Sequence, residues 1–398
     1  MQLPTGLKDL LYRGYSAMIL RPRLARVWPP VATQEQLDDL LPRLHFHFPK
    51  GWTVEVPLAS AGLKPSGKLP YYMADYADRC ESTIRLTGPG ANLIPSLLWR
   101  GGTLLSAPVE RIAGGRVLQY LPNVAPFDPT DVEMETFWVA KFHHQGQRRS
   151  IAPSRQQLLA YIRTLPRRKK AYLLCTGPSL SRFAEFDYGD GYVIGCNSVV
   201  SNESLMLHAK PQFIVASDPI FHFGPSIYAE KFRQDLASAA QRFPFLFLTL
   251  NVYHHLLRTH VAMARDRMCE VPLNLTTATA PLDEEFSVPQ TANIMTMFML
   301  PLAQTIAEEI YIIGADGREP GETYFWKHDP ASQLTDKMQA IKDCHPAFFE
   351  KRDYVDYYDT HCAIVKGQIE SIEARGGRVY ALTPSYIPAL AQRPAPAR

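Results

Sequence analysis

The stretch AYLLCTGPSLSRF, from Ala171 to Phe183, decides the predicted fold. An apolar run that does not alternate with polar residues is typical of a strand buried on both faces of a parallel sheet. The Thr-Gly-Pro-Ser turn that follows ends the strand, and Ser179 is a residue type that caps helices. The stretch therefore predicts a buried strand that passes through a tight turn into a helix.

Five further apolar runs of this kind follow along the chain. They are YVIGC (192–196), QFIVAS (212–217), FLFLTL (245–250), IYIIG (310–314) and RVYAL (378–382). The segments between them show helical periodicity, and the last one stops at Gly376-Gly377, a typical helix end. Repeated strand–helix units predict an α/β fold with a Rossmann-like doubly wound parallel sheet in residues 166–388.

Residues 1–165 lack this regular alternation. Short apolar runs at 52–59, 82–88, 93–99, 116–122 and 136–142 are predicted as strands, and 34–44 and 154–165 as helices. We expect an N-terminal α+β region here. This region is our candidate for the part of the protein that binds the acceptor. The Pro/Ala-rich end, residues 389–398, is expected to be a disordered tail or a linker.

Composition narrows the class of protein. The chain has 398 residues and a formal net charge of +3, which argues against a nucleic-acid partner. Its six cysteines form no CxxC pair, which is typical of a reduced, cytoplasmic protein. No apolar run approaches the length of a membrane span. The basic segment 1–28 is either a helix packed on its own domain or a peripheral contact with the inner membrane.

In an open parallel sheet, ligands bind beyond the carboxyl ends of the strands. The first such end carries Thr176, Gly177, Pro178 and Ser179. Gly177 allows the backbone to approach a ligand, and a helix that begins at this turn offers N–H groups to an anion such as a phosphate. The same residues also fit an ordinary strand-to-helix turn, and their spacing alone does not separate the two interpretations.

Two other strand ends carry polar side chains. Asn197 can donate to and accept from a sugar or a base, or it can bond its own backbone in a turn. Asp218 can act as a base or nucleophile in the ligand crevice, or it can cap the next turn. His222 is close enough in sequence to lie beside Asp218.

The end of the chain contributes a polar loop and a histidine. The loop after the run at 310–314 contains Asp316, Arg318, Tyr324, Lys327 and His328. Such a cationic and aromatic set suits a departing phosphate. His361 is expected at the start of the last long helix, where the helix N-terminus would keep it neutral and able to act as a base. A solvated loop and a structural histidine are the alternatives.

The sequence contains no DxD, no HExxH and no Cys/His spacing typical of a metal site. We therefore expect neither a metal nor a cofactor. A donor without a pyrophosphate, such as a CMP-activated sugar, would need no metal to bridge its phosphates.

The order of these motifs resembles a known family. TGPSL, GCN, SDP, the run TANIMTMFMLPLAQTIAEEIYIIGADG and the late DTHCAIV…VYALTPS are similar to motifs of the bacterial sialyltransferase-like glycosyltransferases. That family includes CMP-sialic acid transferases and their relatives among motility-accessory-factor and Kdo transferases. The resemblance covers residues 170–388 and leaves the N-terminal region without a counterpart.

The resemblance implies roles for particular residues. Those that would contact the CMP part of the donor are Thr176 (where the family usually has Asn), Gly177, Pro178, Ser179, Asn197, Thr291, Ala292, Asn293 and Tyr324. Arg318 replaces a second phosphate-binding Tyr of the family, and a cation can serve the same purpose by charge. His361 lies within a few residues of the family's general base.

The main departure from the sialyltransferases is Asp218, where they have Asn. The retaining β-Kdo transferases resemble this chain at that position, since a carboxylate that attacks the anomeric carbon gives a glycosyl-enzyme intermediate. The resemblance implies retaining transfer of Kdo from CMP-Kdo to a bacterial surface glycan, either lipopolysaccharide O-antigen or capsule. Asp218 would be the nucleophile, and His361 or His222 would assist proton transfer.

Three alternatives stay open. The first is an inverting transferase that uses CMP-sialic acid or another nonulosonic acid and a histidine base. The second is a diphosphotransferase similar to the pterin pyrophosphokinases, which would need ATP and magnesium. The third is a non-catalytic module that binds a glycan or a nucleotide.

Overall fold

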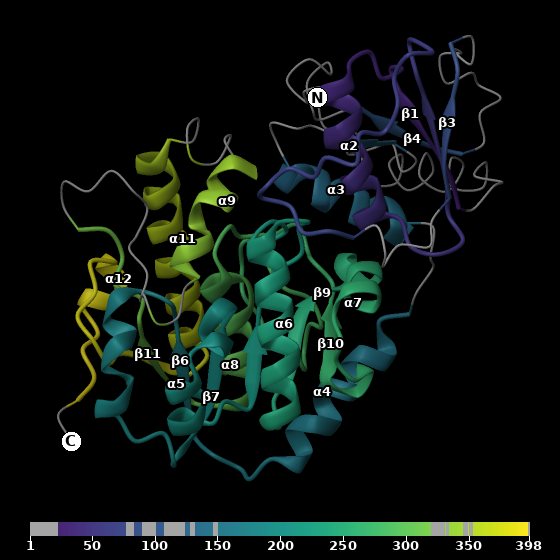
Figure 1. Cartoon of the computed structure of the whole chain (residues 1–398). Coiled ribbons are helices and arrows are strands. Elements are labelled where there is room, and N and C mark those ends of the chain that lie inside the picture. The colour runs from purple at the N-terminus through teal and green to yellow at the C-terminus, as the bar shows by residue number, and fades with distance from the viewer. Residues whose placement is uncertain are drawn as a thin grey trace, which may run out of the picture.

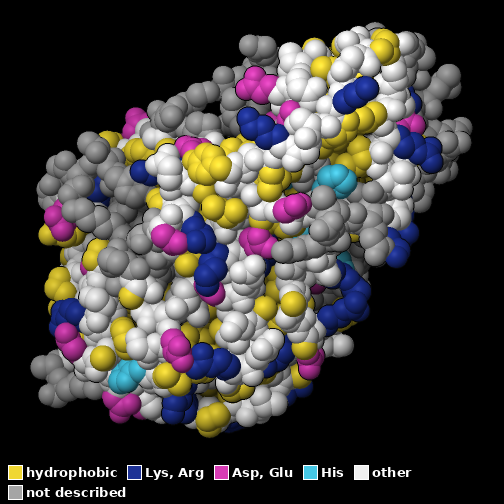
Figure 2. All heavy atoms as spheres, viewed as in Figure 1, with side chains coloured by type: hydrophobic (Ala, Val, Ile, Leu, Met, Phe, Trp, Pro, Cys, Tyr) yellow, Lys and Arg dark blue, Asp and Glu magenta, His cyan; other side chains and the backbone are white. Residues whose placement is uncertain are grey.

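The computed structural model describes residues 23–76, 83–89, 101–106, 124–127, 132–145, 150–319, 331, 334–344, 349 and 353–396. Two lobes are visible, an N-terminal lobe at the upper right of Figure 1 and a larger carboxyl-terminal lobe below it. On the face shown in Figure 2, acidic and basic side chains are interspersed, in line with the net charge of +3. Among the described residues, no helix has both the length and the apolar character required to cross a membrane.

In the described part of the carboxyl-terminal lobe, seven strands form one sheet. They are β6 (Lys170–Leu174), β7 (Gly191–Cys196), β8 (Phe213–Val215), β9 (Leu246–Leu250), β10 (Met268–Val271), β11 (Glu309–Ile313) and β12 (Arg378–Ala381). Their order is β10-β9-β8-β7-β6-β11-β12, and every neighbouring pair is parallel. The predicted α/β doubly wound sheet is therefore confirmed. Strand β10 was not predicted, because its four residues include Glu270 and give too short an apolar run.

Helical segments connect these strands. They are η4 (Pro178–Glu185), η5 (Asn197–Ser201), α5 (Glu203–Ala209), α6 (Ile227–Arg242), η6 (Asn251–Tyr253), α7 (His254–His260), η7 (Arg265–Arg267), η8 (Met295–Met299), α8 (Leu300–Ile306), η10 (Thr335–Lys337), α9 (Met338–Cys344), α11 (Tyr354–Ala374) and α12 (Pro388–Ala391). Segment η8 is a π-helical turn, in which the N–H of Leu300 donates to the carbonyl of Met295. Pro301 explains the wider turn, since it has no N–H to continue the α-helical pattern.

In the described part of the N-terminal lobe, five strands form a second sheet. They are β1 (Leu24–Trp28), β2 (Thr53–Pro57), β3 (Thr83–Thr87), β4 (Gly102–Leu105) and β5 (Val124–Pro126). Their order is β3-β2-β1-β4-β5. The region was expected to be of α+β type, but its strands are all parallel, as in the other lobe. The predicted strands at 93–99 and 116–122 lie outside the described residues.

The helices α2 (Gln34–His47), α3 (Val132–Gln145) and α4 (Ala152–Thr164) complete this part of the chain. Two of them were predicted, but segment 136–142 was predicted as a strand and lies in α3. The buried positions Glu135, Val139, Ala140 and His143 follow helical spacing. A glutamate and a histidine on the buried face hid that spacing from a search for apolar residues.

The two lobes share a buried interface. Helix α3 packs against α7 and η6. His260 Nε2 lies 2.8 Å from the carbonyl oxygen of Phe46, and the guanidinium of Arg233 donates to the hydroxyl of Tyr76 at 2.7 Å. These contacts join helices of the carboxyl-terminal lobe to the chain of the other lobe.

The described end of the chain is ordered, in contrast to the expected disordered tail or linker at 389–398. After α12, the N–H of Ala381 donates to the carbonyl of Arg393 at 2.7 Å, and the N–H of Ala395 donates to the carbonyl of Ala381 at 2.9 Å. Arg393 also forms two hydrogen bonds with the carboxylate of Glu373. The segment therefore lies along the edge strand β12.

The strand order defines where a ligand site is expected. From β6, the chain builds β7 to β10 on one side of the sheet and then returns to place β11 on the other side of β6. Open α/β sheets form a crevice at such a reversal, outside the carboxyl ends of the strands. In this protein the reversal lies between β6 and β11.

Candidate functional site

A cavity lies at the carboxyl ends of β6, β7 and β11. Five of the residues predicted from the sequence line it: Thr176, Gly177, Asn197, Asn293 and His361. The structure thus brings together side chains from four separate segments of the sequence. The cavity volume of about 70 Å³ accepts a small chemical group, so a larger ligand would extend beyond the mouth of the cavity.

The turn after β6 is tied to the loop that follows β11. The N–H of Gly177 donates to the carbonyl of Gly314 at 2.8 Å. The N–H of Ser179 lies 3.2 Å from each carboxylate oxygen of Asp316. Pro178, the first residue of η4, has no N–H to offer. An anion that approached this turn would therefore meet the carboxylate of Asp316.

Two cysteines line the cavity. Cys175 directly follows β6, and Cys196 is the last residue of the adjacent strand β7. A hydrogen bond with the Cys175 thiol, together with burial, raises the pKa of Cys196. A Cβ at Gly314, whose φ is +77°, would lie 2.2 Å from the carbonyl oxygen of Cys175. The ends of β6 and β11 therefore approach each other closely. The raised pKa keeps the thiol of Cys196 neutral.

Asn197 adopts a conformation that is uncommon for a residue with a side chain. Its φ is +51°, in the left-handed region. Its Oδ1 is buried and, among the described residues, has no hydrogen-bond partner. The turn interpretation would have this oxygen bond its own backbone, but the structure leaves it unpaired in a residue that lines the cavity.

The segment 291–293 forms the turn before η8. Thr291 is buried, and its hydroxyl accepts from Thr296 Oγ1 at 2.9 Å. The carbonyl of Ala292 accepts from the hydroxyl of Tyr357 at 2.8 Å. Asn293 Oδ1 accepts from a backbone N–H two residues on, and Asn293 also lines the cavity. Of the three predicted residues here, only Asn293 reaches the cavity.

His361 lies in the second turn of α11 and lines the cavity. Its exposed fraction is 6%. Burial lowers the pKa of His361 to about 4, so the imidazole is neutral at physiological pH. The predicted neutrality has a different cause from the expected one, because the helix begins seven residues earlier, at Tyr354.

Arg318 follows the cavity-lining Gly317. Its guanidinium lies over the ring of Tyr358, with the Arg318 Cζ 5.0 Å from the ring centroid. Its Nη1 is buried and has no hydrogen-bond partner within the described ranges. Tyr324, Lys327 and His328 lie outside the described residues.

Asp218 and His222 form a compact turn after β8. Asp218 Oδ1 accepts from the N–H groups of Ile220 at 2.8 Å and Phe221 at 2.7 Å, which is the turn-capping alternative. The N–H of Asp218 donates to His222 Nδ1 at 3.1 Å. Burial, and secondarily Arg233, lowers the pKa of His222 to about 3. His222 therefore lies beside Asp218 as expected, but it is a buried, neutral hydrogen-bond acceptor. In the described part of the chain, neither Asp218 nor His222 lines the cavity.

Asp316 was expected in a polar loop but was not among the residues predicted to bind a ligand. In the structure Asp316 lines the cavity and engages Ser179. Ile387, which follows β12, also lines the cavity and was not predicted. The available signal was the position of Asp316 three residues after β11, in the turn Gly314-Ala315-Asp316.

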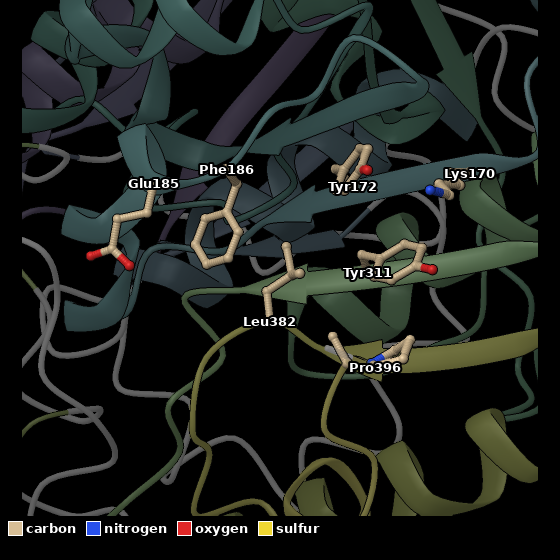
Figure 3. A pocket seen from close by; sticks show the side chains of 8 residues that line it. Lys170, Tyr172, Glu185, Phe186, Tyr311, Leu382 and Pro396 are labelled. Carbon is tan, nitrogen blue, oxygen red and sulfur yellow. The ribbon is translucent and has the colours of Figure 1, made fainter. Parts of the chain in front are cut away.

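A second hollow lies on the sheet face over β6 and β11. Figure 3 shows Tyr172 and Tyr311 on these adjacent strands, with Phe186, Leu382 and Pro396 around them. Its volume is about 440 Å³. The rings of Tyr172 and Tyr311 stack on each other, with their centroids 5.4 Å apart. None of the predicted site residues that the structure describes lies in this hollow.

Comparison with protein-family models, with curated proteins and with solved structures finds no match for this chain. Among the described residues, no three His, Cys, Asp or Glu side chains gather in a way that would hold a metal ion.

Proposed function

We propose that the chain is a glycosyltransferase whose donor is a CMP-activated ulosonic acid, with Kdo as the first candidate and a nonulosonic acid as the second. The observation that carries the proposal is the convergence of four motif segments on one cavity at the reversal of strand order. Within the described residues, the amide oxygen of Asn197 is unpaired there. An unpaired buried polar atom costs roughly 1–3 kcal/mol, and a donor group of a ligand would recover this energy.

The cavity would take a part of CMP that carries hydrogen-bond donors. The exocyclic amino group of cytosine and the ribose hydroxyls are such groups, and Asn197 Oδ1 would accept from one of them. The rest of the donor would extend past the mouth of the cavity. Arg318 is the cation next to the lining residue Gly317, and it would stabilise the charge that develops on the departing phosphate.

His361 is the histidine that lines the cavity among the described residues, and it would be the proton acceptor of the inverting alternative. It lines the cavity, and its pKa of about 4 leaves the imidazole neutral at physiological pH. In an inverting reaction the acceptor hydroxyl would attack the anomeric carbon, its proton would pass to His361, and CMP would leave with the electrons of the broken C–O bond. This geometry favours the inverting reaction as a second candidate beside the retaining one.

The retaining reaction assigns the first displacement to Asp218. Its carboxylate would attack the anomeric carbon, CMP would leave with the bonding electrons, and the acceptor hydroxyl would then displace the carboxylate while a base takes its proton. The two hydrogen bonds to Oδ1 hold the carboxylate in one orientation. Because Asp218 follows β8, the reacting carbon would lie beyond the cavity, over the end of that strand.

The test compares wild type with Asp218→Asn and His361→Asn in the presence of EDTA. CMP-Kdo and CMP-sialic acid are supplied in turn, and CMP release and the intact mass of the protein are measured. The variant that removes the reacting group should lose roughly 10²–10⁴ in rate and still bind CMP. A sugar adduct on wild type that is absent from Asp218→Asn indicates the retaining reaction.

Two exposed residues supply matched controls. Asp187→Asn and His208→Asn make the same chemical changes at the protein surface and should leave the rate unchanged. Wild type that neither binds CMP nor releases it from either donor would contradict the proposal. CMP release that persists in EDTA separates this proposal from the diphosphotransferase, which would need ATP and magnesium.

A further inference from the structure

The loop after β11 places a carboxylate where the turn after β6 offers an N–H group. Both oxygens of Asp316 lie 3.2 Å from the N–H of Ser179, at the start of η4. Asp316 is half-buried and lines the cavity. Burial raises the pKa of Asp316, and the nearby carboxylate of Glu319 adds to this effect. The position is one that an anion would otherwise take.

The other N–H groups at the start of this turn are used within the chain. Gly177 donates to the carbonyl of Gly314 at 2.8 Å, and Leu180 donates to the carbonyl of Gly177 at 3.0 Å. Pro178 has no N–H. The N–H of Ser179 is therefore the one among these that can exchange a side-chain acceptor for an acceptor on a ligand without breaking a backbone hydrogen bond.

We propose that Asp316 is an internal substitute for the anionic group of the ligand and thereby sets the charge selectivity of the cavity. A phosphate that approaches Ser179 must displace the carboxylate or lie beside it, and like charges a few ångströms apart repel. A neutral nucleoside meets no such repulsion. The inference rests on the proposed function for its choice of CMP as ligand, whereas the competition applies to any small anion.

The experiment measures the affinity of the full chain for CMP and for cytidine by calorimetry. Removing the charge with Asp316→Asn should tighten CMP binding roughly tenfold and leave cytidine binding unchanged. Asp316→Ala, which also removes the acceptor of the Ser179 N–H, should change CMP affinity in the same direction. Asp187→Asn removes an equal charge at an exposed position beyond η4 and should change neither affinity.

Two outcomes would overturn the inference. If Asp316→Asn weakens CMP and cytidine binding equally, the carboxylate is a direct partner of the nucleoside. If the ratio of the two affinities stays at its wild-type value, the carboxylate does not lie at the anion position.

Binding of inorganic phosphate tests this inference independently of the proposed function, because phosphate carries the anionic group without the nucleoside. Its affinity, obtained from the rise in Tm with phosphate concentration, should also increase roughly tenfold in Asp316→Asn. A gain for phosphate in a protein that binds neither CMP nor cytidine would uphold the inference and contradict the proposed donor. If the protein binds CMP but Asp316→Asn does not raise the affinity for CMP or phosphate, the proposed donor would be upheld and the inference contradicted.

Discussion

The carboxylate of Asp316 lies so close to Gly177 that a Cβ at position 177 would meet Asp316 Oδ2 at 2.2 Å and the carbonyl oxygen of Gly314 at 2.5 Å. The backbone of Gly177 does not itself require glycine, since its φ of −70° and ψ of 167° suit any residue. Glycine is needed at position 177 because the loop after β11 packs directly against the turn after β6. This contact joins the segments that follow the two strands at the reversal, and Gly177, Gly314 and Asp316 all line the cavity.

Gly177→Ala should lower the free energy of unfolding by roughly 1–3 kcal/mol, because the new methyl group overlaps both a carboxylate and a backbone oxygen. Urea denaturation measures the change. Gly367→Ala is the matched control, since no described atom outside the neighbouring backbone of α11 lies within 4 Å of a Cβ built at that position. The control should raise the free energy of unfolding by roughly 0.5–1 kcal/mol through helix propensity. Wild-type stability of Gly177→Ala would show that Asp316 moves away without cost.

Asn197→Gly should weaken CMP binding and leave the protein at least as stable as wild type. Glycine accepts a φ of +51° readily and removes a buried oxygen that is unpaired among the described residues. We expect CMP affinity to fall by roughly tenfold, the value of one hydrogen bond to a buried partner. Asn202→Ala is the contrast, because Asn202 caps α5 through the N–H of Leu205. Asn202→Ala removes this cap and should lower the free energy of unfolding by roughly 1 kcal/mol without changing the affinity for CMP. A large loss of stability in Asn197→Gly would mean that the side chain supports the fold instead.

His222→Asn should reduce the sensitivity of the fold to acid. The pKa of His222 is about 3 in the folded protein against its ordinary value of 6.5, so the unfolded chain binds more protons between these pH values. The stability contribution is complete above pH 6.5 and declines as the pH falls from there towards 3, by about 1.4 kcal/mol per pH unit. The asparagine oxygen can still accept from the N–H of Asp218. Unfolding free energies measured between pH 7 and pH 4 should therefore fall less steeply in the variant, whereas parallel curves would contradict the burial argument.

Truncation after Gln392 should destabilise the carboxyl-terminal lobe. It removes the two backbone hydrogen bonds to Ala381 and the paired hydrogen bonds between Arg393 and Glu373. The expected loss is roughly 1–3 kcal/mol, from about 0.5–1.5 kcal/mol for each backbone hydrogen bond and little for a partly exposed ion pair. A chain that ends at Pro396 keeps all of these contacts and is the control. Equal unfolding midpoints for the two truncated chains would show that the segment along β12 contributes nothing.

Sequence reasoning was most successful where local signals agree. The apolar runs, the turn at Gly177 and the helix that ends at Gly376 each carry their own evidence, and the structure has strands, a turn and α11 at these places. It was wrong about 136–142 because polar residues occupy part of the buried face of α3. The prediction of a disordered tail was based on composition. Composition does not reveal that the guanidinium of Arg393 donates hydrogen bonds to the carboxylate of Glu373.

The site was harder to predict than the fold. The strand-end rule selected Asn197 and the turn at Gly177 because each follows a strand. The contact between Ser179 and Asp316 joins residues separated by 137 positions, and no local pattern encodes it. For Asp218 the sequence left capping and catalysis both open, since a carboxylate before a proline suits either role. The hydrogen bonds to Oδ1 appear only when the turn is built.

Strand β6 has β7 on one side and β11 on the other, but β11 is synthesised after β7, β8, β9 and β10. During synthesis from the N-terminus, β6 to β10 are available to pair first, and the apolar strand β6 then stands at the rim of an unfinished sheet. The backbone N–H and C=O groups of such an edge are unpaired and can form hydrogen bonds with strands of other molecules. The arrival of Glu309–Ile313 therefore brings the lining segment Gly314–Gly317 to the cavity and, in the same event, covers the edge at which newly made chains would aggregate.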